Sequence, residues 1–398
     1  MKFLFITTRP LIPNNAGNTV RTYSIMKWLK AKGHTVNWIS FVTDSEQNCL
    51  NEHTEELNTI CNRFIPVPIN RKKAYSNCFK AIFTGKPFKA EFYNFKSAND
   101  IIKNELKNNE YDYISGYLYL TTQFLKFCKK GKIWLDLVDS ISMLYERQIP
   151  NCKNIIKKLL LTEEKRRVLN VEKYAIKHFD LVTMISEVDK KHLSKYSDTS
   201  KIVLIKNGVD IDERFSVEYN PNEIAYLGHM EYIQNHNAAM WFIENVLPQL
   251  VSKNPQVTFK IIGKDPKPEL CEYCKDNKNI VITGQVDDVR KELMSAALLV
   301  CPIKISSGLQ NKVLEAMSVG VPAIVTPQVA IPITNDKNIL LQAQDTQEWI
   351  EQIDNICEDK EARGKLSQNS KEFIKENFAW TNILNELLNI LETENQRQ

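Results

Sequence analysis

The segment 304–326 contains the residues of this chain that are best suited to chemistry. A loop with Ser307 and Gly308 precedes a helix that we expect to begin near Gln310 or Asn311. The first turn of a helix offers backbone N–H groups that have no partner within the helix, and small residues before it let an anion come close. The sequence therefore predicts a phosphate-binding site at the start of this helix.

Two charged residues follow in the same helix. Lys312 can add a positive charge to a bound diphosphate, and Glu315 lies three residues later, on the same side. A carboxylate beside a phosphate site can accept hydrogen bonds from both hydroxyls of a ribose, as the acidic residue of dinucleotide-binding folds does. The residue types alone leave a second interpretation open, an ordinary surface ion pair between the two side chains.

Further candidate residues follow expected strands in the first half of the chain. Asp139 comes after a strand at 132–138, where a charged group usually faces a cleft, and a helix N-cap is the alternative. Gly17 and Asn18 lie between the first strand and the first helix, where N–H groups are again available. Arg21 is one turn into that helix and could reach an acceptor phosphate; a surface charge is the alternative.

Short apolar runs alternate with amphipathic stretches along the chain, and the pattern starts anew after 207–222. Strands are expected at 2–8, 36–42, 63–67, 111–116, 132–138, 181–185 and 203–205, and then at 223–227, 258–262, 280–283, 298–302 and 322–326. Alternating strands and helices indicate parallel sheets with helices on both faces. The sequence predicts an α/β protein with two Rossmann-like units, which bind ligands at the carboxyl ends of their strands. The stretch 346–392 is expected to be helical throughout.

Composition excludes several classes of protein. The chain has 398 residues, 43% of them hydrophobic and 25% charged, which is ordinary for a globular protein of two or three domains. No apolar run approaches the roughly 18–20 residues of a membrane span, and the start does not resemble a signal peptide, so a cytoplasmic protein is expected. Of nine cysteines only Cys271 and Cys274 form a C-x-x-C, and we interpret all nine as free thiols. No metal site is predicted.

Charge is distributed unevenly along the chain. Residues 1–200 have a net charge of +12 and residues 201–398 a net charge of −8. The basic half is expected to meet an anionic membrane surface, a phosphate-bearing acceptor or nucleic acid. The basic stretch 71–89 is interleaved with aromatic residues, and 153–167 is also basic, which suits an anionic membrane; a solvated face is the alternative. Nucleic acid is not expected, because no signature of a nucleic-acid-binding domain occurs.

Residues 307–326 resemble the signature of the retaining GT-B glycosyltransferases of family 4. That signature contains LEAMA-x-G-x-PVV-x-T, and residues 314–326 read LEAMSVGVPAIVT. The stretch 310–315, QNKVLE, resembles a subgroup of sugar transferases from bacterial exopolysaccharide clusters. Further similar segments are 207–210, 226–228, 260–263, 281–286 and 377–380, so that the resemblance covers nearly the whole chain.

The resemblance implies transfer of a sugar, with retention, from a nucleoside diphosphate sugar that is most often UDP-linked. The acceptor would be a glycan or a lipid-linked glycan, and no metal or other cofactor would be needed. Residues 1–205 would bind acceptor, 206–375 donor, and the helix 376–398 would pack back on the first domain. The enzyme would be cytoplasmic or peripheral on the inner face of the cell membrane.

The resemblance also assigns residues to roles. Donor-binding residues would be Gly17, Gly228, Gly284, Ser307, Gly308, Leu309, Gln310, Asn311, Lys312 and Glu315. Asn18 and Arg21 would bind acceptor, and the catalytic residues would be Asp139, Lys312 and His229, the last as a hydrogen-bond donor to phosphate.

This sequence departs from the family pattern in two places. Ser307 stands where a Glu near the transferred sugar is common, and the stretch 229–237 lacks the Arg and Lys that hold the diphosphate in many relatives. These departures favour one alternative, a weakly active or non-catalytic partner subunit. A nucleotide-sugar epimerase on the same scaffold is a second alternative, which would need more acidic and His groups in the cleft.

Overall fold

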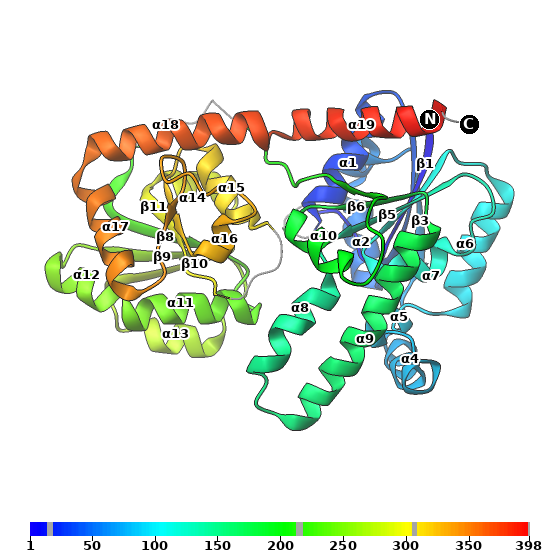
Figure 1. Cartoon of the computed structure of the whole chain (residues 1–398), viewed down its shortest axis with the longest axis horizontal. Coiled ribbons are helices and arrows are strands. Elements are labelled where there is room, and N and C mark those ends of the chain that lie inside the picture. The colour runs from blue at the N-terminus through cyan, green and yellow to red at the C-terminus, as the bar shows by residue number, and fades with distance from the viewer. Residues whose placement is uncertain (14–18, 212–217, 305–308, 397–398) are drawn as a thin grey trace. The chain divides into compact units, whose positions relative to one another are not determined.

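The computed structural model describes residues 1–13, 19–211, 218–304 and 309–396 (Figure 1). The chain forms two compact units, one of residues 1–206 with 384–398 and one of residues 207–383. Each unit is a parallel sheet with helices on both faces, so the prediction of two Rossmann-like α/β units is confirmed.

The first unit has a seven-stranded parallel sheet in the order β3-β2-β1-β4-β5-β6-β7. The strands are β1 (Lys2–Thr7), β2 (Thr35–Val42), β3 (Arg63–Pro68), β4 (Tyr113–Tyr117), β5 (Lys132–Val138), β6 (Leu181–Met184) and β7 (Ile202–Leu204). Residues 3–6 of β1 form a continuous apolar run, and β4 is buried along its whole length, because both faces of the sheet are covered. The order reverses between β1 and β4, the point in such sheets where ligands usually bind.

Helices pack on both faces of this first sheet. They are α1 (Val20–Ala31), α2 (Asp44–Glu52), α3 (Thr54–Ile60), α4 (Arg71–Thr84), α5 (Phe88–Glu91), α6 (Lys96–Asn108), α7 (Thr122–Leu125), α8 (Ile141–Gln148), α9 (Ile155–His178) and α10 (Glu187–Ser194), with short 3-10 turns at Tyr119–Thr121 and Ile149–Asn151. Helix α4 has capping residues at both ends that are typical of α-helices. The Asn70 side chain accepts a hydrogen bond from the backbone N–H of Lys73, and Gly85 ends the helix in a left-handed conformation.

The second unit has a six-stranded parallel sheet in the order β10-β9-β8-β11-β12-β13. The strands are β8 (Asn220–Leu227), β9 (Thr258–Ile262), β10 (Ile280–Gly284), β11 (Ala296–Cys301), β12 (Ala323–Val325) and β13 (Leu341–Gln342). The helices are α11 (Ile233–Asn245), α12 (Leu247–Lys253), α13 (Pro268–Cys274), α14 (Val289–Met294), α15 (Asn311–Ser318), α16 (Pro327–Ala330), α17 (Thr346–Glu358) and α18 (Lys360–Asn377), followed by α19 (Trp380–Gln396), most of which belongs to the first unit. Strand β13, only two residues long, has no counterpart among the expected strands.

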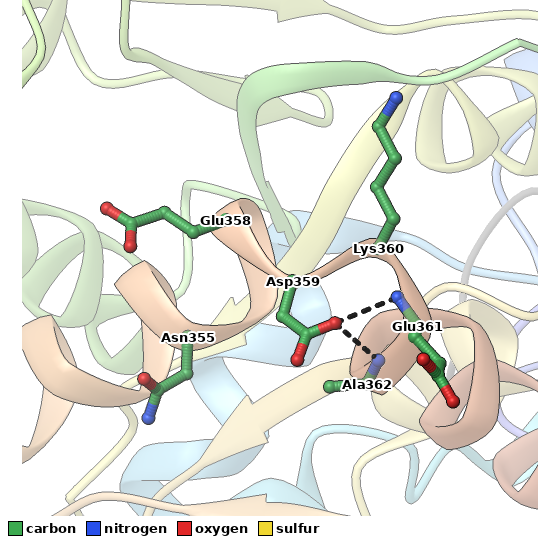
Figure 2. A pocket seen from close by; sticks show the side chains of 6 residues that line it. All are labelled: Asn355, Glu358, Asp359, Lys360, Glu361 and Ala362. Atoms are coloured by element: carbon green, nitrogen blue, oxygen red, sulfur yellow. Dashed lines mark hydrogen bonds between the residues drawn. The ribbon is translucent and has the colours of Figure 1, made fainter.

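The C-terminal stretch is helical, as expected, apart from breaks at Asp359 and at 378–379 that divide it into three helices. Figure 2 shows the first break, a shallow hollow lined by 355 and 358–362, in which the Asp359 carboxylate accepts hydrogen bonds from the N–H groups of Glu361 and Ala362, both at 2.9 Å. A side chain that caps a helix start in this way interrupts the previous helix. The Asp359 carboxylate therefore has a structural role.

The last helix, α19, joins the first unit from residue 384 onward. The hydroxyl of Tyr113 on β4 donates a hydrogen bond to the carbonyl of Leu391 at 2.8 Å. Within the described residues, no helix is both long and apolar enough to cross a membrane.

Candidate active site

Helix α15 begins at Asn311, as the sequence predicted, after a loop that leaves the end of β11. Its apolar side, which includes Val313, Leu314 and Met317, is fully buried, and this packing fixes the helix against the sheet. Leu309 is buried too, and Gln310 occupies the N-cap position without a capping hydrogen bond from its side chain. The expected site residues Ser307 and Gly308 lie outside the described residues, as do Gly17 and Asn18 of the first unit.

The structure places the Lys312 ammonium at the carboxyl end of β8. Its Nζ donates a hydrogen bond to Oδ1 of Asn235 at 2.7 Å and lies 5.0 Å from the ring centre of Tyr226. A Cβ atom added at Gly228 would lie 2.9 Å from this Nζ, so the glycine is what allows the amine to approach the strand end. Lys312 is half-buried, and burial lowers the pKa of its ammonium group.

Asn235 is a site residue that our sequence interpretation missed. Its Nδ2 donates a hydrogen bond to the backbone carbonyl of His229 at 2.9 Å, and the backbone carbonyl of Asn235 accepts one from the Tyr226 hydroxyl at 3.0 Å. It therefore connects Lys312 to the loop after β8. A signal was present in the sequence, because Asn235 lies in the stretch 229–237, which was noted for its lack of Lys and Arg. An amide there accepts a hydrogen bond from Lys312, whereas a second ammonium would repel it.

Three glycines end the neighbouring strands β8, β9 and β10. A Cβ at Gly263 would lie 2.0 Å from the carbonyl oxygen of Gly228, so the backbones of the two strand ends touch at this point. Gly284 has a φ of +70°, which favours glycine. Together they leave backbone rather than side chains at the edge of the sheet where Lys312 lies.

Glu315 is half-buried on α15 and makes no ion pair with Lys312 within 4.0 Å among the described residues. The surface-pair interpretation therefore does not fit the structure. Burial raises the pKa of its carboxyl group to about 7, although Lys312 and Arg290 nearby favour the ionised form. No hydrogen bond joins the Glu315 side chain to another described residue, which suits the carboxylate to bind the hydroxyls of a sugar.

We expect Glu315→Gln to raise the thermal midpoint of the ligand-free protein at about pH 8 and to leave it nearly unchanged at about pH 4. The carboxyl has a pKa of about 7 in the folded protein against an ordinary value of 4.5. Between these values the folded state binds more protons than the unfolded state, so stability falls as pH rises from about 4.5 to about 7 and changes no further above that range. Glutamine removes that loss. Calorimetric scans across this pH range test the effect, with the exposed Glu358→Gln as control; equal differences at both ends of the range would contradict it.

His229 lies in the loop after β8 beside two acidic residues. Its Nε2 is 2.7 Å from Oδ2 of Asp265 and 3.6 Å from Oε2 of Glu231. A neutral His229 that donates from Nε2 to Asp265 keeps only an acceptor at Nδ1, so donation to a phosphate requires the protonated ring. In the described part of the chain, these three residues form the one group whose ligand atoms could hold a metal ion, all within 4.8 Å of one another. That the chemistry needs no metal stays a prediction.

Arg21 is placed inside the first unit, where its donors are occupied. Its Nε is 2.7 Å from Oδ2 of Asp136, its Nη2 is 3.1 Å from Oδ1, and Nη1 donates to the carbonyls of Ile205 and Lys206 at 2.8 and 3.0 Å. Arg21 is only 2% exposed. Arg21 thus ties α1 to β5 and to the end of the first unit, and this geometry gives no support to the expected contact with an acceptor phosphate.

Asp139 follows β5 and is half-buried. Val138 before it has a φ of 66°, which is unusual for a β-branched residue and turns the chain sharply at the strand end. Oδ1 of Asp139 has no hydrogen-bond partner among the described residues, and burial, followed by the neighbouring Asp189, raises its pKa to about 7. The helix N-cap here is Ser140, which accepts from the N–H of Met143, so the capping alternative for Asp139 does not apply.

Glu172 is a second buried carboxyl near Asp139 that our sequence interpretation did not identify. It is fully buried and accepts hydrogen bonds from the hydroxyls of Ser140 and Ser142, and burial raises its pKa to about 7. The N–H of Ser140 donates to Asp189 at 2.8 Å. The start of α8 is therefore held by buried carboxyl groups, which fixes the position of Asp139.

Comparison with known proteins agrees with this geometry. Residues 221–359, which include Gly228, Lys312 and Glu315, match the family described as Glycosyl transferases group 1. An uncharacterized glycosyltransferase of Methanocaldococcus jannaschii is 26% identical over 235 residues, and the match spans 55% of this chain and 56% of that relative.

Two solved structures share the fold of the whole chain. HepE of Anabaena, in complex with UDP, has a TM-score of 0.68 at 14% identity and covers 99% of this chain and 100% of its own. Sucrose-phosphate synthase of Thermosynechococcus elongatus has a TM-score of 0.74 at 16% identity and full coverage of both chains. The chain has the GT-B fold, as predicted, and its second unit carries a glycosyl transferases group 1 domain.

Proposed function

We propose that this chain is a retaining glycosyltransferase that moves a sugar from a UDP-linked donor to a glycan or lipid-linked acceptor. The observation that carries the proposal is the placement of Lys312 and Glu315 on α15, within the matched domain. The amine of Lys312 is held at the carboxyl end of β8 by Asn235, beside strand ends formed by glycines. A cation at a helix start, with a carboxylate three residues further along the helix, suits the binding of a nucleoside diphosphate.

The residues of α15 would bind the nucleotide part of the donor. Lys312 and the start of α15 would contact the diphosphate, and Glu315 would accept hydrogen bonds from the ribose. Structures similar in fold support a uridine nucleotide, because HepE has been crystallised with UDP and with UDP-glucose. The role of His229 would be a hydrogen bond to phosphate from its protonated ring.

The chemical step would be a front-face substitution. The bond between the sugar anomeric carbon and the diphosphate oxygen breaks, the acceptor hydroxyl oxygen forms the new bond on the same face, and its proton passes to the departing phosphate. The contribution of the chain is then to position the reactants and to stabilise the negative charge of the leaving group. Lys312 and the α15 start supply that stabilisation in the proposed mechanism, without a metal.

The first unit would bind the acceptor. Asp139 supports this assignment, because it has a carboxylate oxygen without a partner after a sharply turned strand end. Such an oxygen can accept a hydrogen bond from a sugar hydroxyl.

We expect UDP and UDP-sugars to raise the thermal midpoint of the protein, and GDP- and CMP-sugars to raise it much less. A ligand that binds only the folded state stabilises it in proportion to the logarithm of its concentration over Kd. A thermal-shift screen followed by calorimetric titration measures the effect. Absence of binding by any nucleoside diphosphate at millimolar concentration would overturn the proposal.

A second function, a partner subunit with little activity, is favoured by the absence of Lys and Arg from the stretch 229–237, in which Asn235 is the residue that contacts Lys312. UDP binding without transfer of sugar to any acceptor or to water would support it over the enzyme.

A further inference from the structure

The first unit exposes large apolar side chains on α4 and on the first turns of α9. The eight residues, here called the apolar face, are Tyr75, Phe79, Ile82, Phe83, Ile155, Ile156, Leu159 and Leu160, each 54–90% exposed. They are eight of the fourteen exposed large hydrophobic residues in the described part of the chain. Such a concentration on a soluble surface marks a place where another molecule binds.

In helix α4 the side that faces the core and the side that faces solvent are exchanged, compared with an ordinary surface helix. Its buried residues are Ala74, Asn77 and Ala81, which are small, whereas Phe79 and Phe83 are 74% and 90% exposed. A surface helix normally turns its large apolar side chains towards the core. Packing within this unit therefore does not explain Phe79 and Phe83.

Helix α9 shows the same inversion and continues the surface. Its first buried residue is Glu164, which accepts from the N–H of Phe88 at 3.0 Å, and Arg167 donates to the Ala81 carbonyl at 2.6 Å. Ile156 and Leu160 lie eight and four residues before Glu164, on the same side of the helix. Ile156 and Leu160 therefore lie on the side of α9 that contacts α4 and α5, but nearer the start of the helix, before that contact begins. In Figure 1 both helices lie at the lower end of the first unit.

Positive charge surrounds the apolar face. The segments 69–90 and 147–162 together contain ten Lys and Arg and no Asp or Glu. The exposed lysines Lys72, Lys73, Lys157 and Lys158 make no ion pair with any carboxylate in the described part of the chain. The surface is therefore both apolar and uniformly positive.

We propose that the apolar face binds the surface of an anionic lipid bilayer, with its side chains in the boundary between headgroups and acyl chains and the lysines on lipid phosphates. A basic helix surface with aromatic and aliphatic residues has this chemistry. The proposal goes beyond sugar transfer and does not depend on it.

Charge and side-chain type argue against two other occupants of the apolar face. A second copy of the chain would bring the same ten positive charges against themselves in a symmetric contact. A nucleic acid would use the rings for stacking but leave the aliphatic residues Ile155, Ile156, Leu159 and Leu160 without a function.

Co-sedimentation with vesicles tests the proposal on the full chain. The protein binds vesicles of phosphatidylcholine mixed with phosphatidylglycerol, binds pure phosphatidylcholine at least about tenfold more weakly, and is released by salt. Two variants are each expected to weaken binding by about tenfold or more. The first combines Phe79→Ser with Phe83→Ser. The second combines Lys72→Glu, Lys73→Glu, Lys157→Glu and Lys158→Glu.

The matched control is Tyr273→Ser with Ile331→Ser, two side chains of the second unit that are each 54% exposed. This variant binds mixed vesicles like the unchanged protein, and all variants keep their thermal midpoint and their response to UDP. Equal binding to neutral and anionic vesicles, or equal loss in the control, overturns the proposal. So does self-association of the unchanged protein, in analytical ultracentrifugation, that the Phe79 and Phe83 substitutions abolish. Loss of the UDP response alone counts only against the proposed function.

Discussion

Replacement of Lys312 by alanine is expected to lower kcat/KM for sugar transfer by about 10²–10³-fold, the usual effect of removing one group that stabilises transition-state charge. The Lys312 ammonium is half-buried at the carboxyl end of β8, where burial strengthens its interaction with a diphosphate. The negative charge on that diphosphate grows as the glycosidic bond breaks. Most of the loss should therefore appear in kcat, with a smaller loss in UDP affinity. Steady-state kinetics and calorimetric titration with UDP separate the two.

Lys365→Ala removes an exposed lysine of α18 in the same unit and is the matched control. It should leave both kcat and UDP affinity unchanged. Lys312→Arg keeps the charge and should recover part of the activity, although its planar head does not reproduce the contact with Asn235. Unchanged UDP affinity and unchanged kcat in Lys312→Ala would show that the diphosphate binds elsewhere.

Replacement of Arg21 by methionine is expected to destabilise the first unit by about 3–5 kcal/mol, because breaking a buried ion pair leaves an uncompensated charge. Asp136 would remain buried at 3% exposure, with Thr183 as its remaining side-chain donor, at 2.8 Å. Two backbone carbonyls at the end of the unit, those of Ile205 and Lys206, would also lose a donor. Urea unfolding followed by circular dichroism should show the earlier transition of this unit.

The double variant Arg21→Met with Asp136→Asn should be less destabilised than the single variant, because the isolated charge is gone. Arg63→Met is the control, since Arg63 pairs with Glu105 from a side chain that is 54% exposed. Its unfolding midpoint should stay close to that of the unchanged protein. If Arg21→Met unfolds like the unchanged protein but loses activity, Arg21 has the acceptor-binding role first expected of it.

The sequence by itself determined the order of strands and helices and the position of the candidate donor site. Apolar runs marked the strands, because a strand buried on both faces must be continuously apolar, as β1 and β11 are. The start of α15 at Asn311, with Lys312 and Glu315 on one side, follows from local spacing alone. The C-terminal stretch was less well predicted, because its break at Asp359 depends on one capping carboxylate.

Only the tertiary structure decided which partner each polar side chain has. Arg21 and Asp136 are 115 residues apart, and Lys312 and Asn235 are 77 apart, so no local pattern reveals either contact. For α4 the sequence already predicted a surface position, and the structure adds that small residues form the side that packs. Local sequence sets the period of a helix or strand, whereas burial and pairing are set by distant segments that pack against it.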